Sequence, residues 1–124
     1  MNSYSPIFQE FAPKELYDLE KLSEQDGALK ISLINDNGCR IRIRFKAFKA
    51  YRKLDEGDAL ISLGQISKSA KPRMSFYRVE PSDFIEWFVK QSYDIYDAKT
   101  LVHFAIITIN DVIDVISRED PIVD

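Results

Sequence analysis

Alternation of apolar and polar positions is the clearest pattern in this chain, and it predicts two neighbouring β-strands. Residues 29–33 carry Leu or Ile at every second position, with Lys and Ser between them. Residues 39–45 repeat this alternation, with Cys, Ile and Phe on one side and Arg on the other. A period of two puts each set of side chains on its own face of a strand. Both segments are therefore predicted to be half-buried antiparallel strands, with Cys39 on the buried face.

Turn signals separate these strands from each other and from what precedes them. Asp26–Gly27 is a strong two-residue hairpin signal, and the Asn-Asp-Asn-Gly sequence at residues 35–38 tolerates the positive φ angles of a second hairpin. Residues 15–25 run directly into the first turn, which favours a strand there. The leucines of that segment also recur every third residue, which is a helical spacing.

The apolar spacing changes after Phe45. Aromatic and leucine side chains then recur every third residue up to Leu54. Either a short helical turn or a bulged, bending strand produces such a pattern. The Asp-Glu-Gly-Asp sequence at residues 55–58 predicts a turn, with Asp58 as the N-cap of a short helix that runs through Leu63.

The second half of the chain predicts one clear helix among strands. Residues 65–75 are polar, basic and interrupted by proline, so a loop is expected, followed by a strand at 76–80. A Pro-Ser-Asp sequence then opens a helix over residues 83–92, which has one apolar face. Residues 101–109 are the most apolar strand and should be central. The β-branched content of residues 112–117 favours a last strand over a helical turn.

Together these elements predict an α+β fold, in which an antiparallel sheet of about five or six strands is packed on one face by one main helix. The 124 residues suit one domain and are too few for two of ordinary size. Residues 1–14 show no period and form an N-terminal arm in this interpretation. Residues 118–124 are acidic and are expected to be a frayed tail.

Composition indicates a folded protein and is compatible with a cytoplasmic location. Hydrophobic residues make up 45% of the chain and aromatic residues 12%, which is enough to fill a core. No apolar run approaches the roughly 18 residues that span a bilayer, and the N-terminus lacks the pattern of a secretory signal. The single cysteine excludes an internal disulfide and is compatible with a reducing compartment.

Charge is polarised along the sequence, although the net charge is only −3. Eleven of the 17 basic residues lie between Arg40 and Val79, where the only acids are those of the 55–58 turn. In space this polarity produces either separate basic and acidic surfaces or strands of opposite sign that alternate across a sheet. The second arrangement is slightly favoured.

The basic strand offers one candidate binding surface. Its outer face carries Arg40, Arg42, Arg44 and Lys46, a set that either forms an ordinary solvated face with intramolecular salt bridges or binds nucleic acid. Cations next to stacking aromatic side chains bind single-stranded nucleic acid, and Phe48, Tyr51 and Tyr77 follow in the sequence. The negative net charge makes the chain unlike nucleic-acid modules, which are usually basic throughout.

The signatures of catalysis and metal binding are missing, so neither an enzyme, a cofactor nor a metal is expected. Four glycines leave little room for a phosphate-binding loop, and one His with one Cys cannot form a zinc site. His103 lies in an apolar strand pattern, so it is interpreted as a satisfied core histidine. The acids at 55–58, the pair Asp94 and Asp97, and the pair Asp111 and Asp114 are interpreted as solvated or capping carboxylates.

Three segments resemble small bacterial proteins that are encoded beside polymorphic toxins, some of them proposed immunity proteins. They are FKAFKAYRKLDEGDAL at 45–60, FYRVEPSDFIEWF at 76–88 and HFAIITINDVIDVIS at 103–117. The resemblance implies an α+β fold and a bacterial cytoplasmic location, and it carries no catalytic residue over to this chain.

A non-enzymatic protein-binding module is therefore the leading functional hypothesis, with an immunity or antitoxin role that masks a basic surface of a toxin. The candidate contacts are Tyr93, Asp94, Tyr96 and Asp97, in which acids and exposed tyrosines share one loop. The alternative is nucleic-acid binding through the strand from Arg40 to Arg44. The sequence does not define an oligomeric state.

Overall fold

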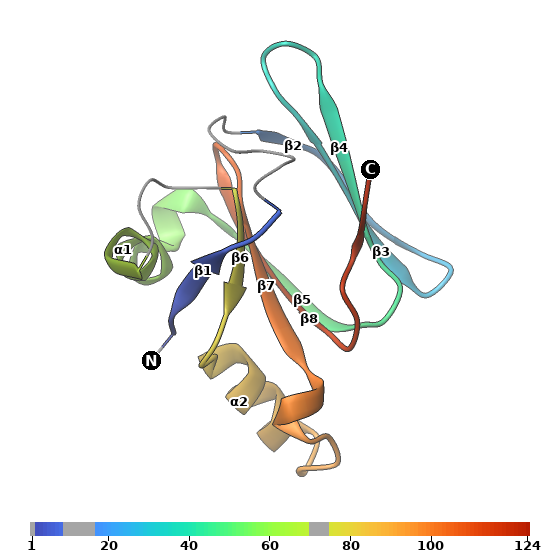
Figure 1. Cartoon of the computed structure of the whole chain (residues 1–124), viewed down its shortest axis with the longest axis vertical. Helices are drawn as coiled ribbons and strands as arrows, with labels where there is room; N and C mark the ends of the chain where they lie inside the picture. The colour runs from blue at the N-terminus through green and yellow to red at the C-terminus, as the bar shows by residue number, and fades with distance from the viewer. Residues whose placement is uncertain (1, 9–16, 70–74) are drawn as a thin grey trace.

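Nine antiparallel strands form two sheets within residues 2–8, 17–69 and 75–124, the part of the chain that the computed structural model describes (Figure 1). The α+β class predicted from the sequence is confirmed, and the strands divide into two sheets where one was expected. The five-stranded sheet has the order β1 (Tyr4–Pro6), β6 (Phe76–Val79), β7 (Val102–Ile107), β8 (Asp111–Ser117) and β5 (Phe48–Asp55). The four-stranded sheet has the order β2 (Asp18–Gln25), β3 (Ala28–Ile34), β4 (Arg40–Phe45) and β9 (Ile122–Val123).

The four-stranded sheet forms around the two predicted hairpins. Asp26 and Gly27 both have positive φ, at 54° and 78°, which is the backbone of a tight hairpin turn between β2 and β3. The Gly38 N–H donates to the Asn35 carbonyl at 3.0 Å and closes the turn between β3 and β4. The alternating apolar positions 29, 31 and 33 of β3 and 41, 43 and 45 of β4 are buried. The Arg positions of β4 are exposed, and the Lys and Ser positions of β3 are half-buried. Both alternating strands, and the strand favoured before the first turn, are confirmed over their described residues.

A bulge explains the three-residue spacing after Phe45. The chain turns there and leaves the small sheet, because β5 pairs with β8 rather than with β4. The register shifts between Phe48 and Ala50, so the strand holds one extra residue. That residue brings Phe48 and Tyr51 to the same side, where both pack against the core. The bulged strand, one of the two predicted alternatives, is the one that forms.

The main hydrophobic core lies between the two sheets. Apolar side chains of β3 and β4 meet those of β6, β7 and β8 there, as alternation on each strand requires. The Phe45 and Phe104 rings contact each other across this interface, with centroids 5.4 Å apart. β7 is the third strand of five, so the prediction of a central apolar strand is confirmed.

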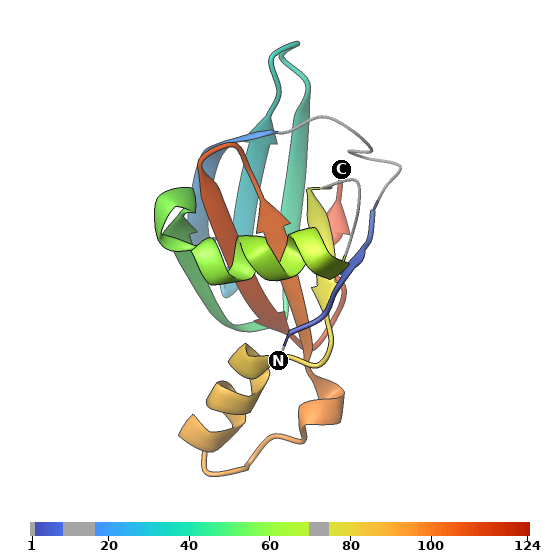
Figure 2. The same cartoon turned by 90° about the vertical axis from the view of Figure 1, so that its left-hand side faces the viewer.

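Two helices cover the other face of the five-stranded sheet (Figure 2). Helix α1 (Leu60–Ser69) packs Ile66 into a cluster with β1, β6, β7 and β8. Helix α2 (Asp83–Gln91) packs Phe84 and Ile85 against the ends of β7 and β8. The predicted helix at 83–92 is confirmed as α2. In the described segments no helix has the length and apolar character needed to cross a membrane.

Helix α1 differs from its prediction at both ends. The Leu63 N–H donates to the Ala59 carbonyl at 3.0 Å, so Ala59 rather than Asp58 precedes the first helical residue, Leu60. The predicted cap, Asp58, lies in the short 3-10 helix η1 (Glu56–Asp58). The predicted loop at 65–75 is wrong for residues 65–69, which continue the helix. Burial of Ile66, one turn after Leu63 at helical spacing, explains the extension. Residues 70–74 lie outside the described part.

Both termini take part in the sheets. Residues 4–6 of the expected arm pair with β6 as β1, whereas residues 9–14 lie outside the described part. The expected frayed tail is wrong, because β9 pairs with β4 and the Arg42 and Asp124 backbones exchange hydrogen bonds of 2.9 and 3.0 Å. The edge of β4 has backbone N–H and C=O groups with which the C-terminal residues can pair. The acidic composition of those residues does not reveal this pairing.

Candidate functional site

The loop after α2 holds a tight, left-handed bend. Tyr93 and Asp94 have φ angles of 52° and 60°, a conformation that is uncommon for residues other than glycine. Three backbone hydrogen bonds of 2.9 to 3.2 Å tie the N–H groups of residues 93–95 to Lys90, Val89 and Ser92. The bend is therefore held by the end of the helix, and its side chains have a defined direction.

Two of the four predicted contact residues extend freely from this loop. Tyr93 is 92% exposed and Asp94 is also exposed. The Tyr96 ring instead packs beside Phe88 at 5.5 Å. The Asp97 carboxylate accepts the Lys99 N–H at 2.9 Å, as the cap of the 3-10 helix η2 (Ala98–Thr100). Tyr93 and Asp94 therefore extend from the bend, Tyr96 is half-buried, and Asp97 is exposed but engaged as a cap.

Two exposed apolar side chains of this region were missed from the sequence. Ile95 is 79% exposed within the loop, and Trp87 on α2 is 53% exposed with its ring stacked on Phe84. The sequence predicted one apolar face for this helix without selecting Trp87 as a contact, and it selected only acids and tyrosines in the loop. An isoleucine between two turn residues was the available signal for Ile95.

The basic strand is a solvent-facing row, as predicted. Arg40, Arg42 and Arg44 are exposed along β4, and Lys46 is exposed in the turn after it. Arg40 forms an ion pair with Glu20 of β2 at 2.9 Å, and its hydrogen bonds lower the pKa of the Glu20 carboxyl. The expected alternation of opposite charges therefore holds at one end of the row.

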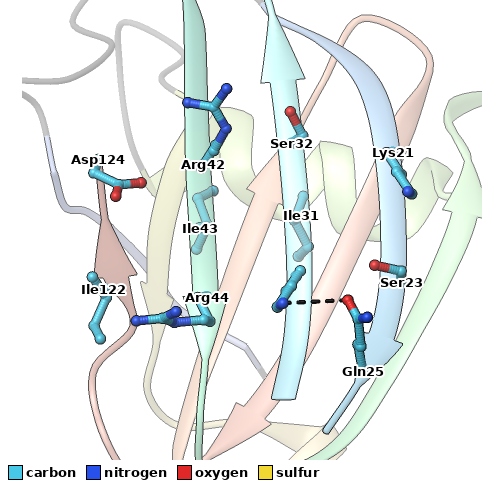
Figure 3. A pocket seen from close by; sticks show the side chains of 11 residues that line it. Lys21, Ser23, Gln25, Ile31, Ser32, Arg42, Ile43, Arg44, Ile122 and Asp124 are labelled. Atoms are coloured by element: carbon cyan, nitrogen blue, oxygen red, sulfur yellow. Dashed lines mark hydrogen bonds between the residues drawn. The ribbon is translucent and has the colours of Figure 1, made fainter.

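A groove lies over the other end of this face, between β2, β3, β4 and β9 (Figure 3). It has a volume of about 330 Å³. Its walls carry Lys21, Lys30, Arg42 and Arg44, with serine and glutamine side chains between them. Alternation in the sequence predicted that the arginines share one face of β4. That the lysines lie beside them is known only from the register between the strands.

The aromatic residues expected to accompany the basic strand lie elsewhere. Tyr77 is fully buried under α1 in the five-stranded sheet. Phe48 and Tyr51 belong to β5 of the same sheet and pack against the core between the sheets. None of the three lines the groove. The expected combination of cations and stacking rings is therefore not assembled.

Other candidate chemistry is placed as follows. Cys39 is exposed rather than buried, because β4 begins at Arg40 and the Cys39 N–H donates to the Asn35 side chain in the turn. Asp55 caps η1 by accepting the Gly57 N–H at 2.9 Å. Among the described residues, no group of three or more His, Cys, Asp and Glu side chains has the geometry of a metal site.

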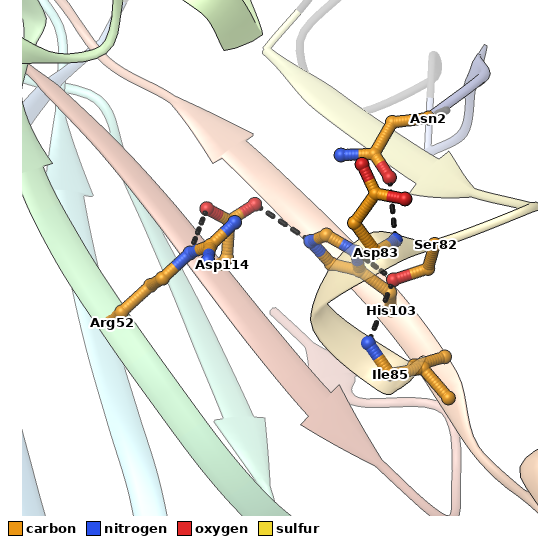
Figure 4. A network of polar contacts seen from close by, with 7 residues as sticks. All are labelled: Asn2, Arg52, Ser82, Asp83, Ile85, His103 and Asp114. Carbon is orange, nitrogen blue, oxygen red and sulfur yellow. Dashed lines mark hydrogen bonds and ion pairs between the residues drawn. The ribbon is translucent and has the colours of Figure 1, made fainter. Parts of the chain in front are cut away.

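A buried polar network joins α2 to the five-stranded sheet (Figure 4). His103 is completely buried, as its apolar strand pattern predicted. Its Nδ1 lies 2.7 Å from Ser82 Oγ, and its Nε2 lies 2.6 Å from Asp114 Oδ1. Arg52 Nε donates to Asp114 Oδ2 at 3.0 Å, and its guanidinium lies 4.2 Å from the centre of the Phe84 ring.

Asp114 is the residue of this network that sequence reasoning placed wrongly. It was interpreted as solvated or capping, yet it is 1% exposed. Burial alone would raise the pKa of its carboxyl, but the hydrogen bond and charge of His103, together with Arg52, outweigh burial and lower the pKa below 3.8. The available signal was one acid flanked on both sides by apolar strand positions.

Acid should weaken the fold through Asp114. A carboxyl with a lowered folded-state pKa stabilises the protein above its unfolded pKa, and that stabilisation is lost as the pH falls through the folded pKa. At pH values below about 4, we expect the unfolding free energy of wild type to decrease with falling pH more steeply than that of Asp114→Asn. The two slopes should differ by at most about 1.4 kcal/mol per pH unit. Urea unfolding between pH 7 and pH 2 measures both. Parallel curves would contradict this assignment.

The same network has the order serine, histidine, aspartate, which also activates nucleophiles in many hydrolases. Here Ser82 Oγ already accepts the Ile85 N–H at 3.1 Å as the N-cap of α2. His103 is completely buried between the helix and the sheet. Each polar group in the row is satisfied by its neighbours, as buried groups require. We interpret the network as a clamp that holds α2 on the sheet.

Comparison with known proteins adds no assignment. The sequence matches no protein-family model, and searches of curated proteins and of solved structures found no match.

Proposed function

We propose that this protein is a non-enzymatic protein-binding module whose contact surface is the 93–95 loop, formed by Tyr93, Asp94 and Ile95. The observation that carries the proposal is the exposure of two large apolar side chains, 92% for Tyr93 and 79% for Ile95, at the tip of one rigid bend. Tyrosine is enriched among residues that dominate binding energy, because it buries a large area with few rotatable bonds.

The backbone of the 93–95 loop supports this role. Positive φ angles at Tyr93 and Asp94 cost free energy, and such conformations persist where the surrounding structure holds them. Here the hydrogen bonds to the last turn of α2 do so. A loop that is already ordered loses little conformational entropy when a partner binds, so more of its contact energy becomes affinity.

The chemistry of the surface defines the partner that it suits. Two apolar side chains flank the exposed Asp94 carboxylate, so a complementary surface has an apolar pocket with a cation at its rim. A toxin with a basic cleft has such a surface. The resemblance of three segments to proteins encoded beside polymorphic toxins supports an immunity role, in which the loop would mask that cleft.

Tyr93→Ala combined with Ile95→Ala is expected to weaken partner binding by at least about 30-fold, the effect of losing one strong hot spot. Co-purification from the cells that encode the protein, with attention to the product of the adjacent gene, identifies the partner. Calorimetry with the purified pair then measures the dissociation constants.

Leu60→Ala with Ile61→Ala is the matched control, because these α1 side chains are also exposed, at 71% and 80%. The control should bind like wild type, and both double variants should keep the urea midpoint of unfolding within a small margin. Equal loss of affinity in the two double variants, or a chain recovered only as a free monomer, would contradict the proposal.

A further inference from the structure

Four cations converge on the outer face of the small sheet from three different strands. Lys21 comes from β2, Lys30 from β3, and Arg42 with Arg44 from β4. The register puts Lys30 directly opposite Arg44, and Ser32 lies between Lys21 and Arg42. Side chains directly opposite each other in an antiparallel pair lie about 5 Å apart at their Cβ atoms. The four charges therefore share one small surface.

This concentration of charge is only partly offset by the protein around it: Glu20 interacts electrostatically with Arg42, and the Lys30 amine donates to Gln25 Oε1 at 3.3 Å. Within the described residues, no carboxylate lies within 4.0 Å of the charged nitrogens of these four side chains. Glu20, the nearby acid of β2, is engaged by Arg40 and by the Ser32 hydroxyl. Like charges directly opposite each other destabilise a sheet, so the fold retains Lys30 beside Arg44 at a cost in free energy.

The surface is also hollowed to the size of a small ligand. Its volume of about 330 Å³ falls in the range of small-molecule sites. Ser23 stands between the cations and supplies a hydroxyl donor, whereas the Ser32 hydroxyl already donates to Glu20 at 2.9 Å. Asp124 is the acidic side chain that lines the groove, against four basic ones. Figure 3 shows the side chains of Arg42 and Arg44 along one wall and Lys21 across from them.

We propose that this groove binds a small phosphate compound that carries several negative charges, such as an oligophosphate or the phosphate chain of a nucleotide. Two guanidinium groups on one strand match phosphate oxygens with paired N–H donors, and the lysines add point charges. Four cations less the one carboxylate of Asp124 give the lining side chains a net charge of +3, which a ligand with several negative charges complements better than a single carboxylate does.

Two observations favour this ligand over a nucleic-acid strand. No aromatic side chain lines the groove, so bases would find no ring on which to stack. The net charge of −3 also disfavours a long polyanion, which would extend past the basic face. A short, highly charged ligand avoids both problems, and it relieves the repulsion between Lys30 and Arg44.

Inorganic tripolyphosphate is the probe that tests the proposal. Calorimetric titration of the whole chain should show saturable binding at one site, weaker in 200 mM than in 50 mM NaCl because salt screens exposed charges. Saturating probe should raise the melting temperature, since a ligand that binds the folded state stabilises it. Arg42→Ala with Arg44→Ala is expected to weaken binding at least tenfold and to abolish the rise in melting temperature.

Lys46→Ala with Arg118→Ala is the control, because it removes two exposed cations outside the groove and so changes the net charge equally. It should bind the probe like wild type. Circular dichroism and urea midpoints establish that both double variants fold. Absence of saturable binding, equal loss in the control, or tight binding of a single-stranded RNA oligonucleotide that tripolyphosphate does not displace would each overturn the proposal.

The groove and the 93–95 loop lie on different parts of the molecule, so the two proposals fail separately. The groove is formed by the four-stranded sheet, whereas the loop follows α2, which packs on the five-stranded sheet and lies at the bottom of both views (Figures 1 and 2). The Arg42 and Arg44 double variant should keep its protein partner, and the Tyr93 and Ile95 double variant should keep tripolyphosphate binding.

Discussion

Replacing Asp114 with alanine is expected to lower the free energy of unfolding by about 3–5 kcal/mol, the cost of removing one partner from a buried charged pair. His103 Nε2 would lose its partner at 2.6 Å while the ring stays completely buried. Arg52 would lose the carboxylate that holds it above Phe84. Helix α2 is tied to the sheet through these contacts, so its attachment should weaken as well. Urea unfolding followed by circular dichroism measures the loss.

Asp111→Ala is the matched control for this variant, because it removes the same kind of side chain from the same strand. The Asp111 carboxylate pairs with Lys53 at 3.1 Å, and the pair is partly open to solvent, with 44% of the lysine side chain and 13% of the aspartate side chain exposed. Exposed ion pairs contribute about 0–1 kcal/mol, so this substitution should have a small effect. If the two alanine variants unfolded at the same urea concentration, the network would not be a clamp.

Phe45→Ala is expected to cost about 3–5 kcal/mol of unfolding free energy, the range for a large aromatic side chain removed from a core. Phe45 is 1% exposed and lies at the corner where the chain passes from one sheet to the other. Its ring contacts Phe104 of β7, so its loss opens a cavity between the sheets. Equilibrium unfolding in urea again provides the measurement.

Two further substitutions serve as controls for Phe45→Ala. Phe45→Leu keeps most of the apolar volume and should cost clearly less than the alanine variant. Lys46→Ala changes the next residue, which is exposed in the turn, and should stay within about 0.5 kcal/mol of wild type. A Phe45→Ala protein as stable as Lys46→Ala would show that the two sheets do not depend on this contact.

The predicted contact loop illustrates why a candidate surface is harder to predict than a strand. Composition selected Tyr93, Asp94, Tyr96 and Asp97 as one group, because all four are residue types found at interfaces. The structure separates them, since Tyr96 packs on Phe88 and Asp97 caps η2. It also adds Ile95, which a sequence pattern would assign to a core. The exposure of a side chain depends on whether another segment packs over it, and the residues next to it in the sequence do not show this.

The buried polar network also shows what could not be predicted from the sequence, in this case for residues inside the protein. His103 could be assigned to the core because its own strand alternates, and the structure confirms it. Its partners Ser82 and Asp114 come from a helix cap and from the next strand. A serine before a helix predicts an N-cap, but not that the same hydroxyl also meets an imidazole. Such a contact exists only after α2 has docked on the sheet.

Local chemistry was enough for the strands and turns of the hairpins around Asp26–Gly27 and residues 35–38, for helix α2, and for the central position of β7. Alternation, turn residues and helix caps act between neighbours in the chain, so they can be recognised without a partner. Other features depend on contacts between distant segments. They are the division into two sheets, the pairing of β9, the extension of α1, and the position of the lysines beside the arginines in the groove. Tertiary packing determines these features, because the free energy of apolar burial depends on the total area buried and not on which segment of the chain supplies it.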